Sequence, residues 1–275
     1  MKVQSFLLNW VIYKFNIMKL IFLGNGGGRW VTITQRLRTC GFRIHANSNI
    51  HIDPGPGTLV SLKRYGVSAM KTDAVLVSHC HPDHYNDAEV MIEAMTKGMT
   101  RNRGFFGGSM SVLKGVQNLG PAISNYHKSK LNQLTLLQPG KTLTIADLKV
   151  KGLKTKHSDP SCVGLKFYLE DGIVTYTADT EYFEGIEKEY SNSKVIIFNV
   201  MRPKSDKIPW HLCVDDAIKI TKKVKPELAI LHHFGMKMIG VEKTEALRME
   251  KTTGIKTITS QEGLQVFLKN KKIEV

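Results

Sequence analysis

The sequence predicts an α/β sandwich in which many short strands alternate with a smaller number of helices. Hydrophobic residues make up 42% and charged residues 23% of the 275 residues, which is the composition of a globular protein with a sizeable core. Short β-branched or apolar runs are bounded by Gly, Pro, Asp or Asn, as strands are. The helical segments between them follow no strict βαβ rhythm, and this mixture favours a sandwich.

The individual elements follow from two periodicities. The apolar runs predict strands at residues 19–23, 48–52, 74–78, 142–145, 148–155, 163–169, 173–177, 194–199, 228–231 and 264–268. Apolar residues spaced three or four apart predict helices at residues 58–65, 87–97, 181–190, 214–224 and 244–251.

Residues 98–130 form the least regular stretch of the chain. Their glycine-rich middle, residues 101–109, is expected to be part of a long mobile loop. Loops of this length in compact domains are often functional.

Residues 1–17 are set apart from the rest of the chain. The segment is too short and too polar to span a bilayer stably, and it lacks the small-residue cleavage site of a signal peptide. Phe6, Trp10 and Tyr13 could share one face of a docking or membrane-surface helix. We expect an accessory or mis-assigned leader, followed by one domain over residues 18–275.

The chain is strongly basic, with 39 Lys and Arg against 24 Asp and Glu, a net charge of +15 and a pI near 9.6. Such a balance favours anionic partners, such as nucleic acid or phosphorylated substrates. The alternative is a lysine-rich solvated surface of the kind found in heat-adapted proteins, because the charge is spread along the chain.

Four cysteines, Cys40, Cys80, Cys162 and Cys213, are scattered without a C-x-x-C pair. This spacing argues against a disulfide framework or a zinc ribbon. Reduced thiols in a cytoplasmic protein are the simpler interpretation.

The motif Ser78-His-Cys-His-Pro-Asp-His84 follows a buried strand predicted at residues 74–78. Its side chains therefore lie on the loop at the strand end, where they can converge. Imidazole nitrogen and carboxylate oxygen are both good zinc ligands. Three of the chain's 10 histidines stand in this motif, which favours a metal site over a polar loop. His79 and His81 would bind one cation, and Asp83 and His84 an adjacent one.

Further donors follow other predicted strands. His157 comes after residues 148–155, Asp179 after residues 173–177, and His232 and His233 after residues 228–231. Each stands where a strand stops and a loop begins, as expected for a site at one end of a sheet.

This ordered set of donors resembles the metallo-β-lactamase superfamily over roughly residues 18–270. The resemblance implies a four-layer αββα sandwich with two metals at the sheet edge. It implies two sets of three ligands: His79, His81 and His157 for the first metal, and Asp83, His84 and His233 for the second.

The resemblance also implies roles for two further aspartates. Asp179 would bridge the two metals. Asp53, in His-Ile-Asp-Pro-Gly-Pro-Gly, matches the family's early aspartate, which orders the ligands by hydrogen bonding to them. An aspartate in a Pro/Gly turn is the structural alternative for Asp53.

Within the superfamily, three segments are similar to the ribonuclease Z branch: residues 157–164, 210–217 and 229–235. The last segment aligns His233 rather than His232 with the metal ligand. The second implies a catalytic pair, His211 and Asp216, in which a carboxylate-backed histidine donates a proton to a leaving oxygen. The alternatives are a structural hydrogen bond for His211 and a helix-dipole role for Asp216. No extended tRNA-gripping arm is evident.

The glycine-rich turn Gly24-Asn-Gly-Gly-Gly-Arg29 is superficially like a dinucleotide-binding loop, but no βαβ unit follows it. We expect a turn that borders the metal cleft. Arg29 would reach towards an anionic substrate or remain solvated.

Together these features predict a metal-dependent hydrolase with two divalent ions. Zinc is the expected metal, and manganese and iron are the alternatives. The catalytic residues would be Asp83, His211 and Asp216. The substrate would be an anion, either RNA or another phosphodiester. The chain would assemble into a homo-oligomer. One alternative is a hydrolase of small carboxyl, lactone or thioester substrates. The other is a non-catalytic nucleic-acid-binding module, against which the complete ligand set argues.

Overall fold

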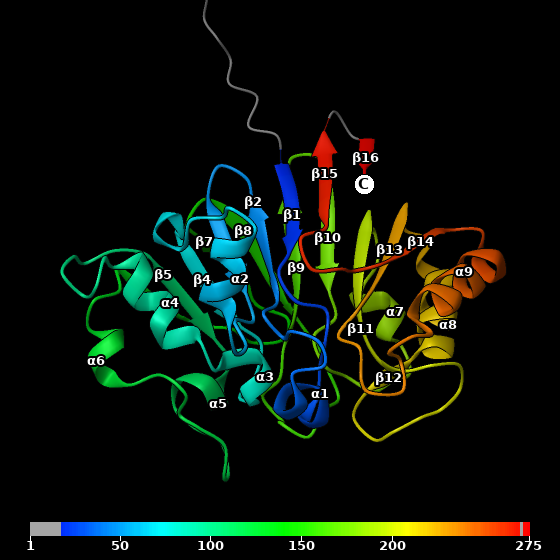
Figure 1. The fold of residues 1–275 in the computed structure, drawn as a ribbon, viewed down its shortest axis with the longest axis horizontal. Coiled ribbons are helices and arrows are strands. Elements are labelled where there is room, and N and C mark those ends of the chain that lie inside the picture. Colours follow the sequence, from blue (N-terminus) through cyan, green and yellow to red (C-terminus); the bar gives the residue numbers. More distant parts are fainter. Residues whose placement is uncertain (1–17, 270–271) are drawn as a thin grey trace, which may run out of the picture.

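The structure, a computed structural model, describes residues 18–269 and 272–275. The expectations for residues 1–17 lie outside this range. The described chain forms two β-sheets packed face to face, each covered on its outer side by helices (Figure 1). This is the predicted four-layer α/β sandwich, and the prediction is confirmed.

The first sheet pairs C-terminal strands with β1 (Met18–Phe22). In spatial order it contains β16 (Lys272–Glu274), β15 (Gln265–Lys269), β1, β2 (Phe42–His45), β3 (Asn49–Ile52), β4 (Ala74–Val77), β5 (Phe105–Gly108) and β6 (Gln133–Leu136). The second contains β14 (Lys256–Thr259), β13 (Leu228–His232), β11 (Val195–Arg202), β10 (Gly172–Tyr176), β9 (Gly164–Leu169), β8 (Leu148–Leu153) and β7 (Thr142–Ile145), and β12 (Leu212–Cys213) pairs with β11.

The helices fall into three groups. On the first sheet lie α2 (Thr58–Arg64), η1 (Ala69–Lys71), α4 (Ala88–Met95), α5 (Met110–Leu113) and α6 (Asn125–Lys128). On the second sheet lie α7 (Ile186–Glu189), α8 (Val214–Val224) and α9 (Glu242–Thr253). At one end of the sandwich lie α1 (Arg29–Thr34) and α3 (Pro82–Tyr85) (Figure 1). No helix in the described ranges has the length and apolar character needed to cross a membrane.

The central strands are apolar throughout because both of their faces are buried. In β4, Ala74 and Leu76 pack between the two sheets, while Val75 and Val77 pack under the helices of the first sheet. The strands β11 and β13 divide their side chains in the same way between the inter-sheet core and the helices of the second sheet. This double burial explains the continuous apolar runs in the sequence.

The prediction of a long mobile loop at residues 98–130 is wrong. The stretch contains β5, which pairs in parallel with β4 and β6, and the helices α5 and α6. Its glycines serve close packing: a Cβ on Gly107 would lie 2.7 Å from a methyl carbon of Leu76. Glycine in this strand therefore marks a close approach, which the sequence alone does not distinguish from a loop.

The helix predicted at residues 181–190 is also largely wrong, because only Ile186–Glu189 is helical. Gly185 precedes this short helix with a φ of 84°, a left-handed conformation that prevents an earlier start. The preceding residues instead form the loop in which Glu181 accepts a hydrogen bond from the backbone N–H of Trp210.

Candidate metal centre

The carboxyl ends of several strands from both sheets meet at one end of the sandwich. β3 and β4 run in parallel in the first sheet, and β10, β11 and β13 run in parallel in the second. The loops that follow these strands carry Asp53, His79, Asp179 and His233. The structure therefore places these four residues, which follow different strands, at the same end of the sandwich.

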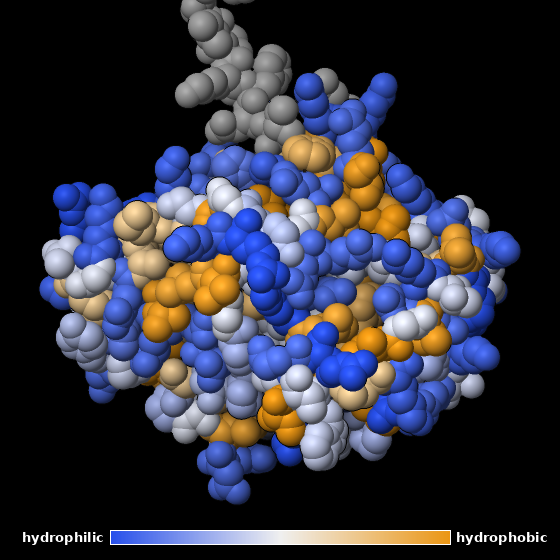
Figure 2. Space-filling view, viewed as in Figure 1, coloured by the Kyte–Doolittle hydropathy of each residue, from blue (hydrophilic) through white to orange (hydrophobic). Residues whose placement is uncertain are grey.

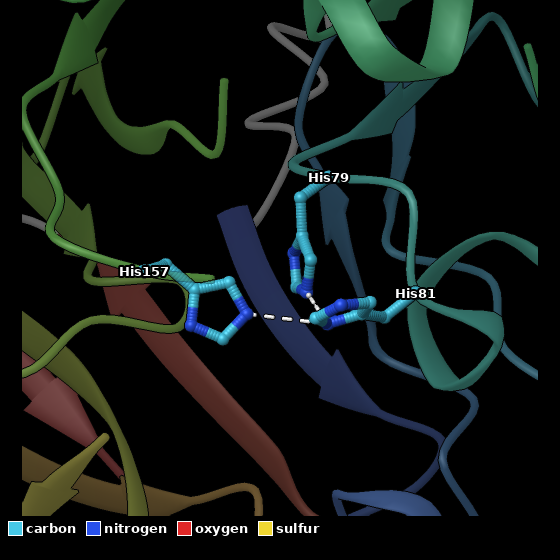
Figure 3. Close-up of side chains that lie close together, drawn as sticks. All are labelled: His79, His81 and His157. Atoms are coloured by element: carbon cyan, nitrogen blue, oxygen red, sulfur yellow. Dashed lines mark hydrogen bonds between the residues drawn. The ribbon is translucent and has the colours of Figure 1, made fainter. Parts of the chain in front are cut away.

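His79, His81 and His157 form one donor cluster, called the imidazole group below. The Nε2 atom of His79 lies 3.0 Å from Nδ1 of His81, and Nε2 of His157 lies 3.2 Å from the same Nδ1 atom. Figure 3 shows nitrogens of the three rings turned towards one another, with His79 and His81 on the loop after β4 and His157 on a separate loop. Such a set of three can hold one metal ion.

Asp83, His84 and His233 form a second donor cluster, called the mixed group. Oδ2 of Asp83 lies 3.5 Å from Nε2 of His84 and 3.3 Å from Nε2 of His233. The two Nε2 atoms are 3.0 Å apart. All three side chains are buried, and together they can hold a second ion.

Asp179 stands between the two groups. Its Oδ2 atom lies 3.9 Å from Nε2 of His79 and 3.5 Å from Nε2 of His84. Its Oδ1 atom lies 3.4 Å from Nε2 of His233 and accepts a hydrogen bond of 2.8 Å from Asn199. One carboxylate therefore faces both donor groups, as the family resemblance implied for a bridging residue.

The ring protonation implied by the hydrogen bonds fits a bound cation. Nδ1 of His84 lies 2.9 Å from the Asp53 carboxylate, and Nδ1 of His157 lies 3.0 Å from the carbonyl oxygen of Trp210. Both Nδ1 atoms donate to these acceptors, so in the neutral form of either ring the Nε2 atom directed towards the cluster is unprotonated. Two donors each about 2.1 Å from a tetrahedral zinc ion lie about 3.4 Å apart, close to the spacings observed.

Asp53 is the buried anchor beneath these ligands. Its carboxylate accepts hydrogen bonds from the backbone N–H and the hydroxyl of Ser78, both at 2.7 Å, and from the Tyr176 hydroxyl at 2.7 Å, in addition to the His84 ring. The Ser78 hydroxyl lies in turn 3.0 Å from Nδ1 of His79. Asp53 thus helps to position donors in both groups, in keeping with the predicted ordering role.

The two donor groups differ in electrostatics. Burial lowers the pKa of His79, His81 and His157, in the last case to about 4, so these rings are neutral donors near pH 7. Burial would also lower the pKa of His84, but the charges of Asp83, Asp179 and Asp53 raise it well above its ordinary value. The pKa of Asp83 is lowered, because the neighbouring histidines outweigh the effect of burial.

His232 and His233 are adjacent but face different surroundings. His232 contacts the Phe22 and Phe42 rings between the sheets, and its Nδ1 lies 2.9 Å from the Ser260 hydroxyl. His233, with a φ of 59°, turns its ring into the mixed group. The preference for His233 over His232 at the centre is therefore consistent with the structure.

His211 lies at the centre, but its ring does not contact Asp216, the partner expected from the sequence. Its Nε2 atom lies 3.3 Å from Oδ2 of Asp179, and its Nδ1 lies 3.0 Å from the carbonyl oxygen of Pro209. Burial opposes protonation of His211, yet the hydrogen bond with Asp179 raises its pKa. Asp216 instead accepts from the backbone of Cys213 at the start of α8 and pairs with Lys207.

The predicted pairing of His211 with Asp216 is thus wrong, since both ring nitrogens of His211 have other partners. Asp216, five residues after His211, is the third residue of α8. At this position its carboxylate caps free backbone N–H groups at the helix start. The helix-start alternative holds for Asp216.

The glycine turn lies against the centre, as predicted. The backbone N–H of Gly28 donates to Oδ2 of Asp83 at 2.6 Å. A Cβ on Gly27 would lie 2.2 Å from the His233 ring, so only glycine allows this approach. Arg29, the next residue, is exposed.

Asp159 contacts the loops of the imidazole group and was not singled out from the sequence, although it lies in the segment 157–164. Its carboxylate accepts from the backbone N–H of Cys80 at 2.9 Å and from the Ser111 and Ser161 hydroxyls. It therefore ties the loop of His79 and His81 to the loop of His157. Its position two residues after a candidate ligand was the available indication.

The comparisons with known proteins agree with this geometry. The sequence profile of the β-lactamase superfamily domain matches residues 48–234, which include both donor groups. The chain belongs to the metallo-β-lactamase superfamily. Members of this hydrolase superfamily use divalent metal ions, which the two donor groups would bind.

The relatives of this metallo-β-lactamase fold protein differ widely in their sequence identity to it. It is 43% identical to an uncharacterized protein of Methanocaldococcus jannaschii, with 93% of this chain and 97% of that protein covered. It is 23% identical to ribonuclease Z of Thermococcus sibiricus, with 79% and 86% covered, which supports the predicted resemblance to that branch. The metallo-β-lactamase fold protein YhfI from Bacillus subtilis superposes with a TM-score of 0.75 at 22% identity, covering 90% of this chain and 98% of that one. The short form of human tRNase Z gives a TM-score of 0.62 at 12% identity, covering 92% and 100%.

Proposed function

We propose that this metallo-β-lactamase fold protein is a phosphodiesterase that uses two divalent metal ions, zinc in the first place, to hydrolyse an anionic substrate such as RNA. The observation that carries the proposal is the placement of two complementary donor groups on either side of one carboxylate, Asp179, with His211 beside it. The similarity to ribonucleases Z and a structural neighbour described as a diphosphatase of the PhnP family, with a TM-score of 0.66, support a phosphate substrate.

In this proposal the imidazole group holds one ion and the mixed group holds the other, with Asp179 between them. Bound there, the ions would lower the pKa of a water and stabilise charge on the attacking and leaving oxygens. Manganese and iron are alternatives, since imidazole and carboxylate donors accept both.

The protein's own residues then position the reacting groups and supply a proton. Hydrolysis forms a bond from the water oxygen to phosphorus and breaks the bond from phosphorus to the leaving oxygen, which must gain a proton. His211 is held from both sides, by the Pro209 carbonyl and by Asp179, with its side chain still 18% exposed. This placement suits a proton donor to the leaving oxygen.

The net charge of +15 supports an anionic substrate, because a basic surface raises the local concentration of polyanions. Hydrolysis of a small carboxyl, lactone or thioester substrate by the same donors is the alternative. A cytoplasmic location and homo-oligomeric assembly remain predictions from the sequence.

The proposal is tested with the metal-loaded protein and bis-p-nitrophenyl phosphate, single-stranded RNA and DNA, a lactone and a thioester. We expect phosphodiester hydrolysis, its loss in His81→Ala, and a 10²- to 10⁴-fold lower kcat with unchanged metal content in His211→Ala, on the order expected for general acid catalysis. His45→Ala is the matched control, since this histidine lies on β2 and contacts Asn49 instead of the centre. Hydrolysis of only the lactone or thioester would contradict the proposal.

A further inference from the structure

Both tryptophans in the described part of the chain are exposed. Trp30 is 69% exposed and Trp210 is 41% exposed. Tryptophan is on average a highly buried residue, so exposure of two such rings is unusual when nothing binds them. Each also stands within two residues of a backbone group that hydrogen-bonds a candidate metal ligand.

Trp30 is joined to the mixed group through the glycine turn. Gly28, two residues earlier, donates to the Asp83 carboxylate, and Gly27 packs against the His233 ring. The next residue, Val31, is 1% exposed and anchors α1 in the core. Trp30 is therefore an exposed residue on a helix whose preceding turn contacts the mixed group.

Ile33 extends this surface, because it lies three residues after Trp30 on the same helix and is 68% exposed. Figure 2 shows hydrophobic atoms next to hydrophilic ones at the end of the molecule where Figure 1 places α1. Trp30 and Ile33 therefore form a pair of exposed apolar side chains on one face of α1, with polar groups beside them.

Trp210 is joined to the imidazole group. Its carbonyl oxygen accepts from Nδ1 of His157, and its N–H donates to Glu181 at 2.9 Å. With a φ of 70°, it occupies a conformation that is unusual for a residue of this size. The backbone of Trp210 is thus hydrogen-bonded to a ring of the imidazole group, and its exposed side chain starts from this fixed point.

The surroundings of Trp30 favour an anionic ligand. Arg29 and Arg36 flank the exposed part of α1, and both are exposed. In the described ranges neither guanidinium forms an ion pair, so both are available to phosphate oxygens. An aromatic ring beside unpaired arginines is the combination with which proteins bind unpaired nucleotides.

We propose that Trp30 and Trp210 are base-stacking sites attached to the two donor groups, and that the substrate is an unpaired single strand of nucleic acid. Stacking needs a free base face, which a duplex does not offer along its length. The strand would place a base on each ring and a phosphate at the centre between them. This proposal rests on the proposed phosphodiesterase function and assigns its substrate class.

The test compares a fluorescein-labelled, hydrolysis-resistant phosphorothioate oligonucleotide with the same strand made abasic at its central positions, using the metal-loaded protein. Trp30→Ala should weaken binding of the intact strand about 5- to 150-fold, the range for loss of one stacked base, and leave abasic binding unchanged. Trp210→Ala should act in the same direction. Trp30→Phe and Trp210→Phe should retain most of the affinity.

Leu247→Ala is the matched control, because this α9 residue is 58% exposed and belongs to neither donor group. Equal losses for intact and abasic strands in Trp30→Ala, no loss for either, or equally tight binding of duplex by the wild type would overturn the stacking proposal. The stacking proposal would also be overturned if Trp30→Ala changed only the KM for an acyl thioester.

Binding and cleavage separate the two proposals. If the protein hydrolyses bis-p-nitrophenyl phosphate but its binding does not depend on a base at Trp30, the stacking proposal fails and the proposed function stands. If binding depends on the base but no phosphodiester is hydrolysed, the proposed function fails and the protein is a nucleic-acid-binding protein.

Discussion

The imidazole group and the mixed group lie side by side, yet they are held in place differently. In the mixed group, His84 is anchored by the buried carboxylate of Asp53, and Asp83 by the backbone N–H of Gly28. In the imidazole group, His157 is anchored by a backbone carbonyl in the loop of Trp210. Asp53 therefore contacts the mixed group directly, but it reaches the imidazole group only through the Ser78 hydroxyl, and the loops of the imidazole group are tied together by Asp159.

The difference also concerns charge. Three neutral rings offer nitrogen donors to a borderline ion such as zinc, while a carboxylate among the donors also suits a harder ion such as manganese. If each group holds an ion as proposed, the two ions would differ in kind although both groups face Asp179. Substitutions that affect one group more than the other test this view.

The largest effect is expected for Asp179→Ala, because this carboxylate faces both groups. Its loss would remove the proposed bridging ligand and the negative charge between the two groups, and the several kcal/mol that such an interaction supplies amount to on the order of 10³-fold in rate. Metal analysis should show both ions depleted, alongside a matching loss of kcat/KM for bis-p-nitrophenyl phosphate. Full metal content with activity within tenfold of the wild type would show that the groups act independently.

A smaller effect, unequal between the two groups, is expected for Asp53→Asn. The amide places an N–H donor where the Ser78, Tyr176 and His84 groups already donate, and it removes the charge behind His84. Loss of such a ligand-orienting carboxylate costs about 10- to 100-fold in metal affinity. Manganese affinity should fall more than zinc affinity, measured by competition with a chromophoric chelator. Equal losses for both metals would show that Asp53 supports the two groups alike through Ser78.

The smallest effect is expected for Asp159→Asn, which loosens the link between the two loops of the imidazole group. Because this carboxylate accepts from several neutral donors, the amide can keep part of the network through its oxygen. We expect about a tenfold loss of zinc affinity, at the low end for residues that orient ligands, with manganese affinity unchanged. Ser161→Ala, which removes one of the same hydrogen bonds, should have a weaker effect of the same kind. A fall in manganese affinity alone would contradict the assignment of Asp159 to the imidazole group.

Much of the fold could be predicted because it depends on local pattern. The buried runs of β4, β11 and β13 are apolar on both faces, and such runs are recognisable without knowledge of their neighbours. In contrast, β5 has the glycine content of a loop, since Gly107 is needed for its contact with Leu76, a residue far away in the sequence. The central strands were therefore predictable, whereas a strand shaped by close packing was not.

For the site, the sequence shows the candidate donors and their places after predicted strands, and parallel strands bring their carboxyl ends to one edge of a sheet. The partners of the individual side chains follow from tertiary contacts: His211 turns to Asp179 instead of Asp216, and Trp30 and Trp210 are exposed although segments close to them contact the donor groups. Side-chain partners and exposure depend on segments that are distant in sequence, as in the contact of Asp53 with Tyr176, 123 positions apart. No local pattern encodes such contacts, and they arise only when the two sheets pack together.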